Sequence, residues 1–131
     1  MSGDRLFLDA NVLFSAAYRP DSGLARLWQL QNVELITSAY ALEEATRNLA
    51  DEGQRLRLRK LLERTRIVIG SSPLPDNVLL PEKDRPVLQA AIHAGATHLL
   101  TGDQRHFGRH FGRRYGGVLI LPPRDYLGKR V

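Results

Sequence analysis

Five acidic side chains of this sequence stand beside or between apolar segments, where a charge is costly unless something compensates it. Asp9 directly follows the apolar run 6–8, and Asp103 follows a second apolar run in LLTGD. Asp84 stands at the start of a predicted helix leading to that second run, and Glu43 and Glu44 lie within an earlier predicted helix. Taken singly, each acid is more simply explained as a helix cap or a solvated helix residue. Gathered in one pocket, however, they would repel each other unless a cation lay among them.

Oxygen ligands without sulfur favour a hard divalent ion. The sequence has no cysteine, and His106 and His110, although four residues apart, lack the glutamate of the zinc-protease pattern. We therefore take these two histidines as surface residues or phosphate contacts and expect Mg²⁺ or Mn²⁺ at the acids. Mg²⁺ is usually completed by substrate phosphate oxygens, and such an ion activates water for attack on a phosphodiester. The acids therefore predict hydrolysis of nucleic acid.

The charge balance also favours a polyanionic partner. Of the 19 basic residues 16 are arginine, and the net charge is +5. Arginine contacts phosphate in a bidentate manner, which lysine cannot do. Seven basic residues lie between positions 101 and 131, against two aspartates in the same segment. Four arginines of this segment are the candidate phosphate contacts: Arg105, Arg109, Arg113 and Arg114.

Short apolar segments alternate with amphipathic helical ones, which is typical of an α/β fold. Strands are expected at residues 5–8, 34–37, 66–69, 97–101 and 118–121. Helices are expected at residues 10–17, from Ser22 onward, at 38–49, at 54–64 and at 84–95, and a long loop at 70–81. Because the strands are almost wholly apolar, we predict a three-layer α/β/α sandwich around a mainly parallel sheet of about five strands. Such a sheet gathers its site at the carboxyl ends of its strands, where Asp9 and Asp103 stand.

Length and composition limit the classes of protein to which the chain can belong. A chain of 131 residues, 43% hydrophobic and 25% charged, is expected to fold as one domain over residues 1–131. No apolar run approaches the roughly 20 residues of a membrane span, and the first residues lack a signal-peptide pattern. The absence of cysteine gives no indication of secretion, so we expect a cytoplasmic protein. No Gly-rich phosphate loop or nucleophilic Ser or Cys motif is present.

Four stretches of the sequence together resemble the PIN domain family, particularly its small prokaryotic members that include VapC-type toxins. They are FLDANVLFSA, LITSAYALEEATRNL, PEKDRPVLQAAIHAGATHLLTGDQRHF and GVLILPPRDYL, in the order and spacing of the family. The resemblance implies a metal-dependent nuclease that acts on RNA, with Mg²⁺ or Mn²⁺ held by four acids. Its implied partners are RNA and, as open alternatives, a cognate antitoxin and a second copy of the chain.

The resemblance also assigns roles to individual residues. Four acids match its catalytic and metal-binding positions: Asp9, Glu44, Asp84 and Asp103. Three residues match supporting positions around them: Asn11, Ser38 and Thr101. Glu43 remains the alternative to Glu44, because neighbours on a helix differ by about 100° in direction. Many relatives carry a further acid where this chain has His106, so one metal ion and two both remain open.

Two other functions compete with the nuclease. A catalytically inactive PIN-fold protein would keep the RNA-binding surface without the chemistry, and His106 at an acid position is the feature that favours it. An aspartyl phosphotransferase would use Asp9 as nucleophile, but it requires a second acid two residues later, where this chain has Asn11. We rank the phosphotransferase last.

Overall fold

The computed structural model describes residues 3–76 and 78–129. Its strands are β1 (Asp4–Leu8), β2 (Val33–Ser38), β3 (Arg66–Val68), β4 (His98–Leu100), β5 (Arg114–Tyr115) and β6 (Val118–Leu121). Its α-helices are α1 (Ala10–Tyr18), α2 (Ala39–Asn48), α3 (Glu52–Leu62), α4 (Arg85–His93), α5 (Gln104–Phe107) and α6 (Pro123–Lys129). Three 3₁₀ segments complete the order: η1 (Gly23–Gln29), η2 (Glu82–Asp84) and η3 (Gly108–His110).

The strands form a single sheet in the order β3-β2-β1-β4-β6-β5. All neighbouring pairs are parallel except β5 and β6, which are antiparallel. From β1 the chain builds outward through β2 and β3 on one side, then crosses back to place β4 on the other side. The order of the strands therefore reverses between β1 and β4, and in open α/β sheets ligands bind at such a switch point, outside the carboxyl ends of the strands.

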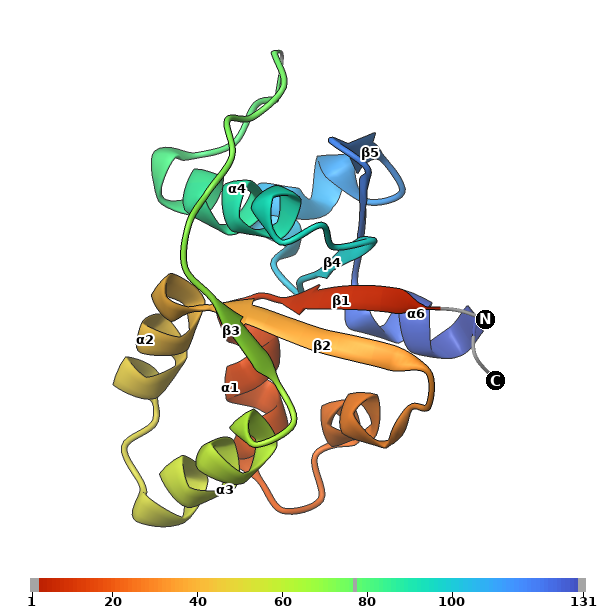
Figure 1. Ribbon diagram of the computed structural model, residues 1–131. Helices are drawn as coiled ribbons and strands as arrows, with labels where there is room; N and C mark the ends of the chain where they lie inside the picture. The colour runs from red at the N-terminus through yellow and green to blue at the C-terminus, as the bar shows by residue number, and fades with distance from the viewer. Residues whose placement is uncertain (1–2, 77, 130–131) are drawn as a thin grey trace.

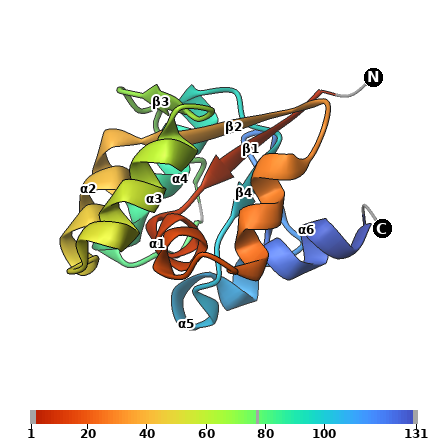
Figure 2. The ribbon, with the colours of Figure 1, turned by 90° about the horizontal axis from the view of Figure 1, so that it is seen from below.

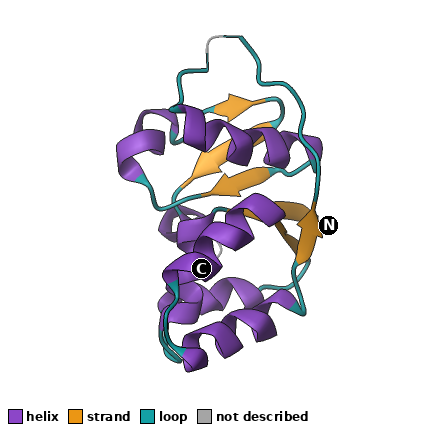
Figure 3. Cartoon of the chain, turned by 90° about the vertical axis from the view of Figure 1, so that its left-hand side faces the viewer, coloured by secondary structure: helices purple, strands orange, loops and turns teal. Residues whose placement is uncertain are grey.

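Helices cover both faces of the sheet, as Figures 1 and 3 show. Figure 2 shows α1, α2 and α3 gathered on one face, together with η1 and α6, while α4 and α5 lie on the other face in Figure 1. Strand β1 explains this arrangement, because successive side chains of a strand point to opposite faces. Leu6 and Leu8 pack into the core beneath α1, and Phe7 packs into the core beneath α4. With both faces buried, the strand has to be apolar throughout.

The predicted α/β/α architecture and its mainly parallel sheet are confirmed, and the sheet has six strands rather than about five. The additional strand is β5, which contains only two residues and pairs at the edge of the sheet. The segment expected as a helix from Ser22 is the 3₁₀ segment η1, and the Ser22 side chain makes no capping bond but donates to the Ser15 carbonyl. The helix α6 was not predicted, although Pro123 is well suited to a first helical turn.

Among residues 3–76 and 78–129, none of the helices is long and apolar enough to span a bilayer.

Candidate active site

Asp9 lies at the carboxyl end of β1 and begins α1. Its Oδ1 accepts a hydrogen bond from the Ala10 backbone N–H at 2.7 Å, as an N-cap residue does. Its Oδ2 accepts from the Thr101 hydroxyl at 2.8 Å and from the Asn11 amide at 3.2 Å. Asp9 is only 6% exposed, so these bonds replace the water that would otherwise solvate its charge.

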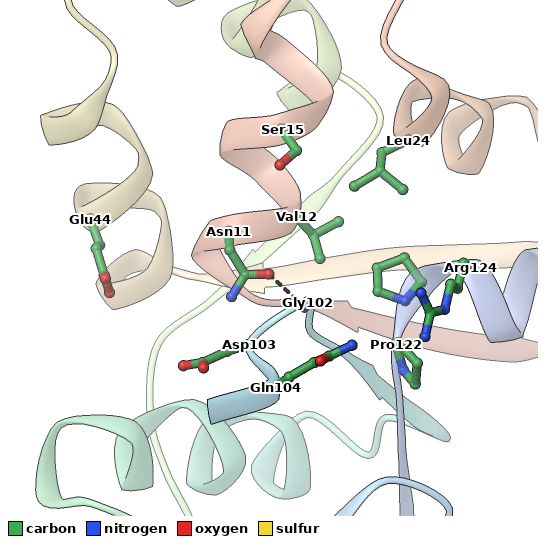
Figure 4. A pocket seen from close by; sticks show the side chains of 11 residues that line it. Asn11, Val12, Ser15, Leu24, Glu44, Gly102, Asp103, Gln104, Pro122 and Arg124 are labelled. Carbon is green, nitrogen blue, oxygen red and sulfur yellow. Dashed lines mark hydrogen bonds between the residues drawn. The ribbon is translucent and has the colours of Figure 1, made fainter. Parts of the chain in front are cut away.

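A short network of hydrogen bonds joins the ends of β1 and β4. Besides contacting Asp9, Asn11 accepts a bond from the Gly102 backbone N–H at 2.8 Å, which Figure 4 marks with a dashed line. The Thr101 hydroxyl, buried like Asp9, also accepts from the Asp103 backbone N–H at 3.2 Å. Asn11 and Thr101 therefore position two of the predicted acids directly.

Asp103 and Asp84 come together around His106. Asp103 caps α5 by accepting from the His106 backbone N–H at 3.1 Å. The Nδ1 of the same histidine lies 2.8 Å from Oδ2 of Asp84 and 3.1 Å from Oδ2 of Asp103. The expectation that Asp84 caps the following helix was wrong, because its side chain makes no capping bond. The carboxylate faces the other acids instead, and Pro86 needs no partner for a backbone N–H in the first turn of α4.

The helix α2 presents Glu44, and not Glu43, to this site. Ser38 begins the helix by accepting from the Ala41 backbone N–H at 3.1 Å, which fixes the direction of the first turn. Glu44 is partly buried and lines the cleft beside Asp9, whereas Glu43 is exposed. Ser38 itself lines a different hollow, so its part in the site is to start the helix that carries Glu44.

All four predicted acids line one cleft of about 340 Å³: Asp9, Glu44, Asp84 and Asp103. Lys83 is the one cationic side chain among the described residues that line it. A second hollow of about 540 Å³ continues from it, and the two share Asn11, Glu44 and Asp103. Figure 4 shows this second hollow extending from Glu44 and Asp103 toward Arg124 on α6. The acids thus stand at one end of a continuous open groove.

The acids alter each other's ionisation. Burial raises the pKa of Asp9 to about 6; its bonds from Thr101 and Ala10 oppose this rise, and the negative charges of Glu44 and Asp84 add to it. Burial also raises the pKa of Asp84, against the opposing influence of His106. Four carboxylates share this partly buried cleft with Lys83, the one cationic side chain among the described residues that line it, and such an excess of negative charge favours a bound cation.

A divalent ion fits the side chains gathered around Asp84 and Asp103. Oδ2 of Asp84 and Nδ1 of His106 are both buried and have no hydrogen-bond partner among the described residues. The two atoms are 2.8 Å apart, a distance at which they contact each other, but they form no hydrogen bond. With the nearby Asp103 oxygen they form the one group of at least three candidate ligand atoms found in residues 3–76 and 78–129, all within 4.8 Å of one another. Asp9 and Glu44 line the same cleft outside this tight group.

The four predicted RNA-binding arginines lie away from the cleft, and all four are exposed. They occupy the segment from α5 to β5, and none lines the groove beside the acids. Arg109 and Arg113 line a separate hollow with Leu79 and Tyr115. The basic side chains that do line the groove are Lys83 and Arg124, which we had not singled out.

The interpretation of His110 as a surface residue or phosphate contact was wrong. His110 is 4% exposed, and both its ring nitrogens have partners: the Tyr115 hydroxyl at 2.8 Å and the Leu79 carbonyl at 2.9 Å. It therefore anchors the long loop to β5. His106 faces the acids, and the spacing of four residues does not bring the two rings together, because α5 ends at Phe107. The position of His106 three residues after Asp103 was the available signal, since that spacing places two side chains on one side of a helical turn.

Comparison with known proteins agrees with this fold. A family model described as PIN domain matches residues 5–105. The fold is similar to that of VapBC2 from Rickettsia felis, solved bound to a DNA fragment from their promoter, with 15% identity and a TM-score of 0.64 over 90% of this chain and 98% of that chain. It is also similar to that of VapBC-1 from nontypeable Haemophilus influenzae, with 16% identity and a TM-score of 0.55 over 92% of this chain and 98% of that chain. No curated protein sequence matches the chain.

Proposed function

Because the chain belongs to the PIN domain family, we propose that it is a divalent-metal-dependent endoribonuclease. The observation that carries the proposal is the convergence of Asp9, Glu44, Asp84 and Asp103 on one cleft, from positions spread over most of the chain. An acid that only caps a helix or is solvated does not have to lie near other acids. Like charges gathered in a partly buried cleft are unfavourable without a cation.

The four acids have different roles in the proposed site. Asp84 and Asp103, with His106, offer the closely spaced ligand atoms for Mg²⁺ or Mn²⁺, and Asp9 and Glu44 complete the negative wall of the cleft. When bound, such an ion supplies acidity for the attacking water and neutralises charge on the phosphodiester. Thr101 and Asn11 keep the carboxylate of Asp9 in one orientation, so that its charge faces the scissile group without reorganisation.

The groove beyond the acids gives the RNA a path. Its open shape admits a single strand, and Arg124 at its far end can hold a phosphate of the strand away from the cleavage position. Hydrolysis at the acidic end would leave a 5′-phosphate and a 3′-hydroxyl. The test is to incubate the purified protein with mixed single-stranded RNAs and either Mg²⁺ or Mn²⁺, and to examine the termini of the products. Cleavage that is unchanged in the presence of excess EDTA would contradict the proposal.

The adjacent acids of α2 provide a matched pair of variants. We expect Glu44→Gln to lower the rate of RNA cleavage by at least about tenfold, as when groups supporting a metal site are removed. Glu43→Gln makes the same chemical change on the exposed side of the helix and is expected to retain the wild-type rate. Initial rates on one fluorescent RNA measure both. An equal loss in the two variants would argue against Glu44 as a residue of the site.

The arginines of the segment from α5 to β5 are proposed as more distant RNA contacts: Arg105, Arg109, Arg113 and Arg114. In EDTA, where binding is separated from cleavage, we expect the affinity for single-stranded RNA to fall as salt rises. Replacing one contacting arginine, such as Arg109, by alanine should reduce the slope of log K against log salt by about 0.7. A slope that is unchanged in all four single variants would remove this surface from the proposal.

The same binding experiment addresses the alternative, a catalytically inactive RNA-binding protein. The contact of His106 with Asp84 and Asp103 favours that alternative, because a protonated imidazole could neutralise the acids without a metal ion. RNA binding in EDTA, combined with no cleavage under any divalent ion, would identify the chain as the binding protein.

We further propose that the enzyme is the toxin of a toxin–antitoxin pair. Support comes from the similarity of its fold to proteins described as VapBC, over nearly the full length of each compared chain. An antitoxin would have to cover the acidic cleft or carry acidic residues against the exposed arginines. Induced expression in a bacterial host should arrest growth, and growth that continues despite confirmed RNA cleavage by the purified protein would contradict the toxin role alone.

A further inference from the structure

His106 brings a nitrogen atom into a group of carboxylate oxygens. Its Nδ1 lies 2.8 Å from Oδ2 of Asp84 and 3.1 Å from Oδ2 of Asp103. The backbone of His106 is held beside Asp103, because the His106 N–H donates to Oδ1 of Asp103 at 3.1 Å. One oxygen of Asp103 thus contacts the backbone of His106 and the other contacts its ring, so the two side chains are held together at two points.

The atoms at the centre of this group lack the partners that buried polar atoms normally have. Asp84 is 9% exposed, and neither its Oδ2 nor the Nδ1 of His106 has a hydrogen-bond partner among the described residues. Buried polar groups are almost always hydrogen-bonded, so two unpartnered atoms facing each other require something that binds both. An electron-pair acceptor that all three side chains can ligate meets this requirement.

The spacing of the three atoms matches that of ligands around a small ion. Adjacent ligands of an octahedral ion with bonds of about 2.1 Å lie roughly 3.0 Å apart. The measured separations from Nδ1, 2.8 and 3.1 Å, lie on either side of that value. The geometry points to a metal site made of Asp84, Asp103 and His106, in which the imidazole nitrogen selects a first-row transition-metal ion, with Mn²⁺ as the probe, over Mg²⁺.

The selectivity follows from the ligand types. Mg²⁺ prefers oxygen ligands and keeps its waters, whereas imidazole suits transition-metal ions, whose affinity for nitrogen and oxygen sites exceeds that of Mg²⁺. Replacing one oxygen ligand by nitrogen therefore disfavours Mg²⁺ more than Mn²⁺. The inference rests on the proposed function only in that both use Asp84 and Asp103 as ligands. It concerns binding of the ion in the absence of RNA.

One competing arrangement accounts for the same distances. A protonated His106 can form ion pairs with both Asp84 and Asp103 and leave no ligand nitrogen for a metal. In that case an ion would bind, if at all, through oxygens alone, and the identity of residue 106 would not decide between Mg²⁺ and Mn²⁺. Ion selectivity therefore separates the two arrangements.

The experiment measures the binding of Mn²⁺ and of Mg²⁺ to the metal-free full chain by calorimetry, without RNA. We expect the wild-type protein to favour Mn²⁺, and His106→Asp, which restores an all-oxygen group, to reduce the ratio of the two affinities by at least about tenfold. His106→Asn removes the imidazole without adding charge, and serves as the second variant if the aspartate variant does not fold. The matched control is His93→Asn, at an exposed histidine of α4 that lies outside the group.

A spectroscopic reading makes the test independent of affinity. Pulsed electron paramagnetic resonance of bound Mn²⁺ should show coupling to a directly bound imidazole nitrogen in the wild type and in His93→Asn, and none in either His106 variant. Bound Mn²⁺ without nitrogen coupling, or an affinity ratio that is the same with and without His106, would overturn the inference. Such a result leaves RNA cleavage untouched, whereas selective Mn²⁺ binding by a protein that cuts no RNA would overturn the proposed function and leave this inference standing.

Discussion

Asp9→Asn is expected to lower divalent-ion-dependent RNA cleavage by at least about a hundredfold, the upper end of the loss observed when groups around a metal ligand are altered. The substitution preserves the volume of the side chain and can preserve the bond from the Ala10 N–H, but it removes the charge. The new amide also faces the Asn11 amide at the position where Oδ2 accepts a hydrogen bond, so two donors meet there. Initial cleavage rates at saturating RNA measure the loss.

Asp21→Asn is the control for this variant. It makes the same chemical change at a side chain that is 85% exposed and pairs only loosely with Arg19, at 3.8 Å. We expect it to retain the wild-type rate. Full activity in Asp9→Asn, with the protein folded and the ion required, would remove Asp9 from the candidate site.

Removing the charge of Asp9 is also expected to change how stability depends on pH in the metal-free protein. The pKa of Asp9 is raised from 3.8 to about 6, chiefly by burial. Below pH 3.8 the carboxyl group is protonated in both the folded and the unfolded state. As the pH rises toward 6 the unfolded chain releases its proton first, so the free energy of unfolding falls, and above 6 the effect levels off.

The size of this effect follows from the interval between the two pKa values. At about 1.4 kcal/mol per pH unit, wild type should lose about 3 kcal/mol relative to Asp9→Asn between about pH 3 and about pH 8. Denaturant unfolding of both proteins in EDTA measures the difference between their free energies of unfolding. The contributions of the other titrating groups are largely common to both proteins and cancel in this difference. A difference that does not vary with pH would mean that Asp9 is solvated as an ordinary carboxylate. Adding Mn²⁺ at neutral pH should recover stability in the wild type, because an ion that binds only the folded state stabilises it.

The elements with strong periodicity were predictable from the sequence, and the reason is burial. Strands β1 and β4 and the helices α1, α2 and α4 carry apolar side chains that must face a core, so their pattern reports their structure. The segments that were missed, β5 and α6, are short, and two residues of edge pairing leave no periodic signal. The predicted strand at 118–121 ends before a pair of prolines, and the second of these, Pro123, starts α6.

The site was predictable as a set of carboxylates, because parallel strands bring their carboxyl ends to one edge. The orientation of each side chain was not. Asp84 stands where a capping residue is expected, but its carboxylate makes no capping bond and contacts the ring of His106 instead. The ring of His110 is hydrogen-bonded to Leu79 and Tyr115, residues with no periodic relation to it in the sequence. Contacts between distant segments decide such cases.

The hydrogen bond between Thr101 and Asp9 spans 92 positions of the chain. During translation, at about 5 to 20 residues per second, roughly 5 to 20 s separate the synthesis of the first partner from that of the second. Throughout that interval the nascent polypeptide holds Asp9 without the hydroxyl that orients it, and without Asp84 for most of the time. The cleavage centre that we propose therefore cannot assemble until most of the chain has been synthesised.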